Sequence, residues 1–390
     1  MEYKFLIRQG FSISILLFFF SCKNSIKDSS VVERIFIEPS AVKNLSELIK
    51  QIDYAVLENP NQAFVQVDKL FVMDEKLILV DLFRTQSLLS YDSQGNFINS
   101  IGKLGDGPEE YLNSIDVAFS KSENLIEILS TTGVVQYSPE GKFVSKFDLN
   151  PRPHKFLKMD SSRYVYYVPQ VMNSELREGF SEDILFRFDV NSKGITPILG
   201  PIFPEVLSFM GDKNNLYGFE DQVVFSSSFC DTIYLFSSNS EVKKIHLDFG
   251  TAQIDLSKLY NLSVYQLVDK MKDDEIRQKA IHIPHLFYNE KYLTSSFLKV
   301  RAFDFFVHDL QDRVTYLSSS LVNDIDSGPG LGKIKMMDEE NIYSVFEPEE
   351  LIQHAQNFGK TNKDKEDRFR NLINQLNGDE FLILAKYKLK

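Results

Sequence analysis

The feature that most constrains the fold of this 390-residue chain is a pair of similar polar turns, 46 residues apart. Residues 91–98 (YDSQGNFI) align with residues 137–144 (YSPEGKFV). In each segment a strand end leads into a polar turn with a glycine, and a second strand opens on an aromatic and a β-branched residue, which is typical of a β-hairpin. Apolar runs of strand length precede both hairpins. Three or four short strands in about 40–50 residues is the period of a β-propeller blade.

Weaker copies of this unit continue to the C-terminus and predict six blades. Their ranges are 64–102, 108–149, 154–200, 210–250, 284–320 and 333–390. Because an open first or last blade would leave a sheet edge exposed, the ring must close. Residues 52–58 and 381–389 both have strand-like patterns, so we expect the N-terminal strand to complete the last blade. The 33 Phe and 17 Tyr residues also favour pleated surfaces. The sequence therefore predicts an all-β, six-bladed β-propeller.

Two segments break the β pattern. Residues 256–281 carry apolar side chains at helical spacing followed by a charged run, which predicts a helical insertion between blades four and five. Residues 348–376 predict a second helical insertion inside the last blade. We expect both insertions to lie outside the blades, over one face of the ring.

The N-terminus has the pattern of an export signal. Lys4 and Arg8 precede an apolar run at residues 11–20, which is too short for a stable membrane anchor and ends at a serine followed by Cys22. A small residue before a cysteine at this point resembles the lipobox of bacterial lipoproteins, in which the cysteine is lipidated and becomes the first mature residue. A plain secretory signal and a single anchor helix are the alternatives.

These patterns divide the chain into three parts. We predict a lipoprotein signal peptide over residues 1–21, a flexible tether over residues 22–40 that begins at the lipidated Cys22, and a single propeller over residues 41–390. With Cys22 lipidated, Cys230 is the remaining thiol, so an internal disulfide is impossible.

The net negative charge of the chain argues against some classes of partner. The formal net charge is −12, and loss of Glu2, Lys4 and Arg8 with the signal peptide would bring it to −13. An acidic surface repels nucleic acid and offers no polybasic patch to lipid headgroups. We therefore expect no nucleic-acid partner, and we expect membrane association to rest on the lipid alone.

Five motifs occur in a recognisable order: NLSELI at 44–49, YAVLE at 54–58, LILVD at 77–81, LLSYDSQGNFINSIG at 88–102 and GDGPEEY at 105–111. This order resembles the six-bladed β-propeller lipoproteins of Bacteroidota, which are similar in fold to TolB and NHL propellers. That family typically has Gly-x-Gly-Pro-Gly-Glu-Tyr in the loop after its first blade, where this chain has Glu109 in place of the last glycine. The resemblance implies a propeller anchored by lipid in the cell envelope, at the outer membrane, facing the periplasm or the surface. It implies little about activity, since propellers host many unrelated functions.

Catalytic signatures are missing from the sequence. Of the six histidines only His282 and His285 are close-spaced, and the proline between them argues against a helical pair of metal ligands. There is no Gly-x-Ser-x-Gly elbow, no HExxH and no Cys/His pairing. We therefore predict no metal, no cofactor and no catalytic residue. An envelope enzyme, a hydrolase or lyase acting on a saccharide or lactone, remains the alternative.

Propellers bind ligands where loops of successive blades converge on the channel mouth. Loop position nominates seven residues for such a mouth: Arg84, Glu109, Glu110, Tyr111, Arg152, His154 and Arg301. The alternative is that they are ordinary polar loop residues. Asp81 and Arg84 could also pair structurally. The glycines at 102–107 do not form a phosphate-binding P-loop, because the Gly-Lys-Ser/Thr end is missing. The predicted partner is an envelope protein, a peptide or a small ligand.

Overall fold

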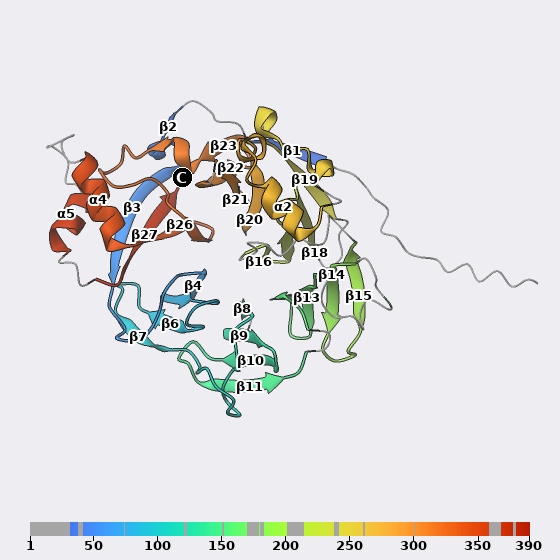
Figure 1. Cartoon of the computed structure of the whole chain (residues 1–390). Helices are drawn as coiled ribbons and strands as arrows, with labels where there is room; N and C mark the ends of the chain where they lie inside the picture. Colours follow the sequence, from blue (N-terminus) through green and yellow to red (C-terminus); the bar gives the residue numbers. More distant parts are fainter. Residues whose placement is uncertain are drawn as a thin grey trace, which may run out of the picture.

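Six small β-sheets form a ring in the computed structural model (Figure 1). The structure describes residues 32–390 except 38–41, 74, 121–122, 150–151, 170–178, 180–182, 201–213, 238–241, 260–261, 301, 359–367 and 377–379. From residue 69 on, the chain completes the strands of one blade before it enters the next, and the first of these strands is the innermost in each blade. The predicted six-bladed β-propeller is therefore confirmed.

The first three blades are regular four-stranded antiparallel sheets. Blade one contains β4 (Lys69–Met73), β5 (Lys76–Val80), β6 (Leu88–Tyr91) and β7 (Phe97–Ser100). Blade two contains β8 (Asp116–Ser120), β9 (Leu125–Ser130), β10 (Gly133–Tyr137) and β11 (Phe143–Phe147). Blade three contains β12 (Lys155–Lys158), β13 (Arg163–Tyr167), β14 (Leu185–Asp189) and β15 (Ile195–Leu199).

The last three blades contain the same four antiparallel strands, and the further elements described below are attached to them. Blade four contains β16 (Leu216–Phe219), β17 (Gln222–Phe225), β18 (Thr232–Ser237) and β19 (Lys243–Asp248). Blade five contains β20 (Ile281–Tyr288), β21 (Tyr292–Lys299), β22 (Ala302–Asp309) and β23 (Val314–Leu317). Blade six contains β25 (Ile334–Met337), β26 (Asn341–Phe346), β27 (Leu382–Leu389) and β3 (Ile49–Leu57).

This topology gives the ring two distinct faces. The turns between first and second strands and between third and fourth strands lie on one face, which we call the turn face. The loops between second and third strands and the connections between blades lie on the other, which we call the loop face. Each first strand therefore runs from the loop face to the turn face.

The two polar turns that revealed the repeat have matching geometry. Both β6–β7 and β10–β11 contain a bulge at the tyrosine that ends the first strand, Tyr91 or Tyr137, and both tyrosine side chains are buried. Gly95 and Gly141 have φ of +94° and +79°. Their N–H groups donate to the carbonyl three residues earlier, at 3.1 and 2.9 Å. Glycine is needed here because other residues rarely adopt this conformation.

The N-terminal strand closes the ring as predicted. β3 pairs antiparallel with β27, from Leu57 opposite Leu382 to Ile49 opposite Leu389. The buried side chains of Ile49 and Ile52 pack in the same apolar cluster as Tyr387 of β27. One blade thus contains strands from both ends of the described chain, with β3 as its outer strand.

A fifth strand in blade four was not anticipated. β1 (Val32–Phe36) pairs in parallel with the outer strand β19, and Ile35 and Ile37 are buried against it. Arg34 forms an ion pair with Asp248 at 3.2 Å. The predicted tether over residues 22–40 did not include this strand, since the charged pair at 33–34 obscures its alternation. A short parallel pair, β2 (Lys43–Asn44) with β24 (Leu321–Val322), follows next to blade five.

Both helical insertions are present. The first contains the 3-10 turn η4 (Leu256–Lys258) and the helices α2 (Val264–Lys270) and α3 (Asp274–Arg277), between blades four and five. The second contains α4 (Pro348–Phe358) and α5 (Arg368–Gln375), between β26 and β27. Both insertions leave the blades at the loop face. Figure 1 shows α4 and α5 beside β3, where Arg368 donates to the Ile52 carbonyl at 3.1 Å. Shorter 3-10 turns lie at η1 (Leu45–Glu47), η3 (Gly250–Ala252) and η5 (Ser318–Ser320).

Candidate functional site

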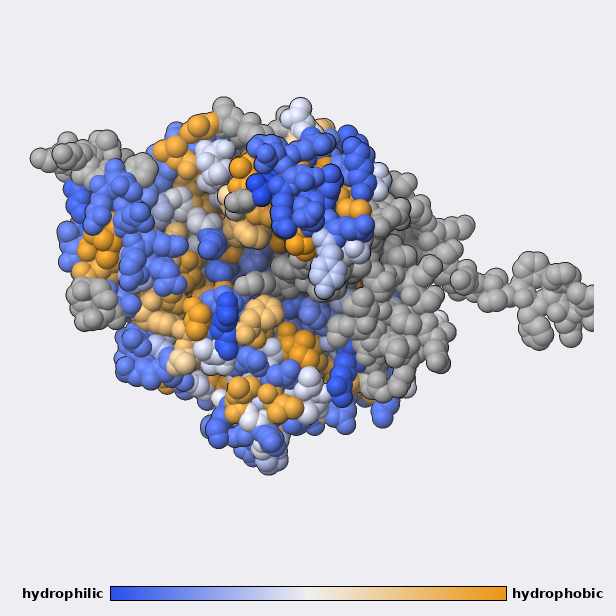
Figure 2. All heavy atoms as spheres, viewed as in Figure 1, coloured by the Kyte–Doolittle hydropathy of each residue, from blue (hydrophilic) through white to orange (hydrophobic). Residues whose placement is uncertain are grey.

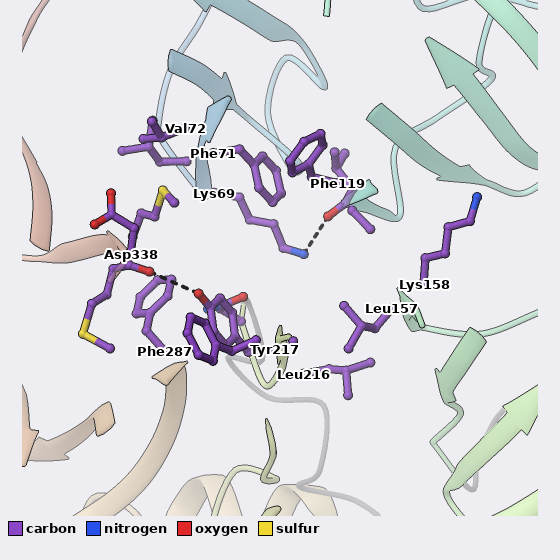
Figure 3. Close-up of a pocket in the computed structure, with 18 of the residues that line it drawn as sticks. Lys69, Phe71, Val72, Phe119, Leu157, Lys158, Leu216, Tyr217, Phe287 and Asp338 are labelled. Atoms are coloured by element: carbon purple, nitrogen blue, oxygen red, sulfur yellow. Dashed lines mark hydrogen bonds between the residues drawn. The ribbon is translucent and has the colours of Figure 1, made fainter. Parts of the chain in front are cut away.

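A cavity of about 760 Å³ lies at the centre of the ring. Because the first strand of each blade has a strand neighbour on one side only, its free edge faces the axis, and all six first strands contribute to the lining. Large apolar side chains from successive blades line it: Phe71, Phe119, Leu157, Tyr217, Phe287 and Met336. Figure 3 shows Phe71 and Phe119 across a common space from Tyr217 and Phe287. In the space-filling view, hydrophilic and apolar side chains lie side by side around the centre of the ring (Figure 2).

A buried ionic cluster joins blades one, two and three beside the cavity. The Lys69 amine lies 2.6 Å from the Asp116 carboxylate. It also donates to the Val117 carbonyl at 2.9 Å, as Figure 3 shows. Lys155 approaches the same carboxylate at 3.4 Å. Burial lowers the pKa of Lys69. Burial alone would raise the pKa of Asp116, but Lys155 and Lys69 hold it below its ordinary value. Of the three residues only Lys69 lines the cavity.

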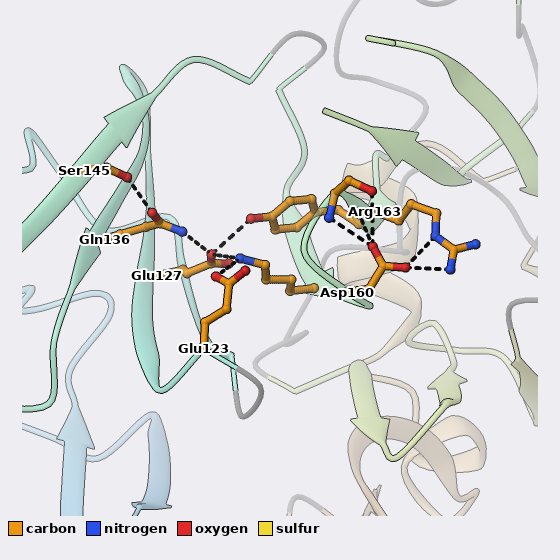
Figure 4. A network of polar contacts seen from close by, with 9 residues as sticks. Glu123, Glu127, Gln136, Ser145, Asp160 and Arg163 are labelled. Atoms are coloured by element: carbon orange, nitrogen blue, oxygen red, sulfur yellow. Dashed lines mark hydrogen bonds and ion pairs between the residues drawn. The ribbon is translucent and has the colours of Figure 1, made fainter. Parts of the chain in front are cut away.

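A second buried network joins blades two and three near the turn face (Figure 4). The Lys158 amine contacts Glu123 at 2.5 Å and Glu127 at 3.0 Å. Glu127 is fully buried and also accepts hydrogen bonds from Gln136 at 2.6 Å and Tyr164 at 3.0 Å. Burial would lower the pKa of Lys158, but the two carboxylates raise it above its ordinary value. The amine therefore stays charged and is satisfied within the protein.

The rim of the cavity at the turn face is acidic. Asp338 lines this end, but its carboxylate accepts from the Asn341 N–H at 2.7 Å and the Tyr343 hydroxyl at 2.8 Å. Glu220 and Glu339 also line it and are exposed. In the described part of the chain neither carboxylate has an ion pair or a hydrogen bond. At the opposite end Lys335 donates to the Val67 carbonyl at 2.5 Å. The free charge at the rim is therefore negative.

A second cavity of about 700 Å³ lies between blades five and six on the loop face. It shares His285 and Lys335 with the central cavity. The His285 ring lies against Phe287 and Phe305, with ring centroids 5.2 and 5.6 Å apart. Burial and the neighbouring Glu350 raise the pKa of Glu347 at this site. The two cavities thus meet at blade five.

The predicted mouth residues that the structure describes belong to loops of the loop face, but they line neither of these cavities. The described ones are Arg84, Glu109, Glu110, Tyr111, Arg152 and His154. Arg301 and Cys22 lie outside the described residues. Whether the described residues contact a partner at the loop face stays a prediction.

The loop at residues 101–115 carries three of these residues and is held by its own contacts. The Glu110 carboxylate accepts from the Gly107 N–H at 3.0 Å and pairs with Lys103 at 2.8 Å. Buried Tyr111 donates its hydroxyl proton to the Gln86 carbonyl at 2.7 Å. The Glu109 side chain is exposed, and its carbonyl accepts from Tyr137 at 2.6 Å. The loop connects blades one and two, as expected.

The other predicted residues have local structural roles. The buried Asp81 carboxylate accepts from the N–H of Arg84 at 2.9 Å, so the pair meets through the backbone while the Arg84 side chain is exposed. His154 is half-buried, and burial lowers its pKa to about 4. His282 is buried, with Nδ1 2.6 Å from the Cys230 carbonyl and Nε2 2.8 Å from the Ser295 hydroxyl. Burial lowers its pKa to about 4 as well.

Two features are absent from the part of the chain that the structure describes. No three or more His, Cys, Asp or Glu side chains there are grouped to hold a metal ion. No helix there has the length and hydrophobicity needed to span a bilayer.

The residues that line the cavity were not predicted, although the repeat pattern contained the information needed to identify them. The innermost strand of a blade faces the axis, so each predicted first strand could have nominated its side chains. Loop position was the weaker guide, because the loops here are occupied by contacts of their own.

Solved structures with a similar fold come from Bacteroides. A protein from Bacteroides fragilis NCTC 9343, described as exported, is 15% identical, and the match covers 92% of this chain and 99% of that one with a TM-score of 0.72. A duf4221 family member from Bacteroides vulgatus is 11% identical over 88% of this chain and 98% of that one, with a TM-score of 0.50. At these identities the likeness concerns the fold alone. No curated protein matches the chain.

A family model covers nearly the whole described chain. The match runs over residues 32–388, from the start of β1 to the residue before the last one of β27. It includes all six blades and both helical insertions. The chain therefore belongs to the family described as Domain of unknown function (DUF4934).

Proposed function

We propose that this protein is a lipid-anchored binding protein of the cell envelope that holds a ligand in its central cavity and has no catalytic role. The observation that carries the proposal is the cavity of about 760 Å³, in which large apolar side chains from all six blades lie beside polar ones. Such concave, mostly apolar sites are typical of small-molecule and peptide binding. The signal sequence, Cys22 and the fold likeness to an exported Bacteroides protein support the location.

The experiment fills the cavity and measures the binding of a neutral apolar probe, N-phenyl-1-naphthylamine. Leu157→Trp enlarges a side chain that lines the cavity. The matched control, Val144→Trp, makes a similar change on an exposed position of β11. We expect the wild type and V144W to increase the fluorescence of the probe equally, and L157W to reduce its affinity about tenfold or more. Equal binding by all three proteins, or no binding by a folded wild type, would overturn the proposal.

An envelope enzyme is the second candidate, and one observation favours it. Lys69, Asp116 and Lys155 converge beside the cavity, and the pKa values of Lys69 and Asp116 are displaced. A neutral Lys69 amine could attack a carbonyl and expel water to form an imine. Pyridoxal phosphate followed by borohydride tests this: preferential labelling of Lys69 in peptide mass maps supports the enzyme. Labelling of exposed lysines without Lys69 supports a structural ion cluster.

A further inference from the structure

We propose that the central cavity selects a ligand in which an apolar body carries a cationic group, an amine or a guanidinium, and that the cation lies at the turn face. This inference rests on the proposed function, because it names the ligand class of the same cavity. The charges, the aromatic rings and one unpartnered hydroxyl of the lining support this ligand class.

The lysines that line the cavity already have acceptors. Lys69 is bound to Asp116 and the Val117 carbonyl, and Lys158 is bound to two glutamates. Lys335 donates to the Val67 carbonyl. An anionic ligand would have to displace one of these contacts and leave a buried acceptor unsatisfied, which is costly. The lining therefore disfavours anions.

The carboxylates at the turn-face rim are free by contrast. Glu220 of blade four and Glu339 of blade six line the same cavity, are exposed, and have neither an ion pair nor a hydrogen bond to any described residue. Their two blades are separated by blade five, so the carboxylates approach the opening from different sides. A cation at this rim would gain charge pairing without breaking an existing contact.

The whole turn face adds to this local charge. Each turn between a first and a second strand carries at least one described carboxylate, at Glu75, Glu123, Asp160, Glu220, Glu290 and Glu339. Glu123 and Asp160 are paired with Lys158 and Arg163, whereas Glu75, Glu220, Glu290 and Glu339 have no ion pair among the described residues. These four carboxylates around a recessed opening make the potential there negative and attract cations. The negative potential of the turn face and the free carboxylates of Glu220 and Glu339 thus both favour a cation at this end of the cavity.

The aromatic walls suit an apolar body with a cationic end. Phe71, Phe119, Tyr217 and Phe287 belong to four different blades, and the Tyr217 and Phe287 rings are 5.4 Å apart in edge contact. Aromatic faces attract amines and guanidinium groups when water is excluded. Ser120, the last residue of β8, also lines the cavity, is 4% exposed, and has no hydrogen-bond partner for its hydroxyl among the described residues. A ligand N–H group would satisfy it.

Two fluorescent probes with the same apolar body test the charge preference. Dansylcadaverine carries a primary amine, and the dansyl derivative of 6-aminohexanoic acid carries a carboxylate on a chain of similar length. We expect the cationic probe to bind the wild type about tenfold more tightly than the anionic probe, with a blue shift for both. The L157W variant is expected to weaken both probes.

Matched charge variants test whether Glu220 and Glu339 cause the preference for the cationic probe. E220Q/E339Q removes the two free carboxylates of the rim, whereas E75Q/E290Q removes two exposed carboxylates of the same face that do not line the cavity. Both double variants change the net charge by the same amount. We expect E220Q/E339Q to weaken the cationic probe about fivefold and E75Q/E290Q to change it less than twofold.

The outcomes separate this inference from the proposed function. Equal binding of both probes that L157W abolishes would overturn the cation preference and leave the cavity as a binding site. Binding that is insensitive to L157W would overturn the proposed function itself. Equal loss in the two double variants would assign the preference to the overall charge of the face and overturn the roles of Glu220 and Glu339.

Discussion

Asp81 organises a whole loop through one buried carboxylate. It accepts hydrogen bonds from the N–H groups of Val65, Arg84 and Thr85 and from the Thr85 hydroxyl, at 2.9 to 3.2 Å. Burial would raise its pKa, but these donors hold the pKa below its ordinary value. The carboxylate is therefore charged at neutral pH and fixes the loop between β5 and β6.

We expect Asp81→Asn to lower the free energy of unfolding by about 2–3 kcal/mol, because an amide turns a donor towards groups that need an acceptor. Arg84→Ala should change it by less than about 0.5 kcal/mol, since that side chain is exposed. Urea denaturation followed by circular dichroism measures both. Similar losses in the two variants would contradict this account.

His282 predicts a pH dependence of stability. Its pKa is lowered from 6.5 to about 4 by burial, so the folded protein keeps it neutral while the unfolded chain takes up a proton below pH 6.5. Stability is then lost as the pH falls from about 6.5 towards 4. Between pH 7 and pH 5 the loss from this residue is about 2 kcal/mol.

The test compares the free energy of unfolding of the wild type and His282→Gln at pH 7 and pH 5. The variant should lose less stability on acidification than the wild type does, by about 2 kcal/mol. His154, whose pKa is also about 4, acts in the same direction and stays in both proteins. The same pH slope in both proteins would refute the role of His282.

At the scale of single elements, the hairpin turns are of two types: those that require a glycine and those that accept another residue. A Cβ on Gly95 would lie 2.2 Å from the Val56 carbonyl oxygen, and one on Gly141 2.7 Å from the Ser100 carbonyl oxygen. Both glycines also have positive φ. In blade three the positive φ falls on Lys193 instead, and a Cβ on Gly194 would meet only the side chain of Ser192.

Gly95→Ala is therefore expected to cost about 2–3 kcal/mol, and Gly194→Ala less than about 0.5 kcal/mol. Thermal unfolding by calorimetry compares the two variants with the wild type. A larger loss in G194A than in G95A would show that the turns are not held as described.

The elements show why some features could be predicted and others could not. The blades follow from local signals, because polar turns with glycine and alternating strands recur at a fixed spacing. β1 could not be predicted, because Glu33 and Arg34 interrupt its short apolar pattern and its partner β19 is distant in sequence. The residues that line the cavity were not predicted either. Its lining depends on which strand is innermost and on contacts such as Lys69 with Asp116, which only the assembled ring brings together.

At the scale of the whole molecule, the pairing of β3 with β27 holds the ring closed. Gln51 and Lys388 are exposed and lie opposite each other in this pair. Gln51→Cys with Lys388→Cys is expected to form a disulfide on oxidation and to raise the free energy of unfolding by about 2–5 kcal/mol. Mass spectrometry detects the bond, and denaturation measures the gain. Failure to form the bond in a folded protein would contradict the closure.

The predicted anchor has a matched control in the second cysteine of the chain. Cys22→Ala should move the protein from the membrane fraction to the soluble fraction and abolish labelling by an alkynyl palmitate. Cys230→Ala should leave both properties unchanged, because Cys230 is buried in blade four. Membrane retention of C22A would refute the lipid anchor.

The central claim is that the protein carries a ligand in the cavity of its ring. The most direct measurement is mass spectrometry of the small molecules and peptides that co-purify with wild type, L157W and V144W from the membranes of the producing bacterium. The account predicts a species with an amine or a guanidinium that is present with the wild type and V144W and depleted at least fivefold with L157W. The same co-purifying species in equal amounts with all three folded proteins would contradict it.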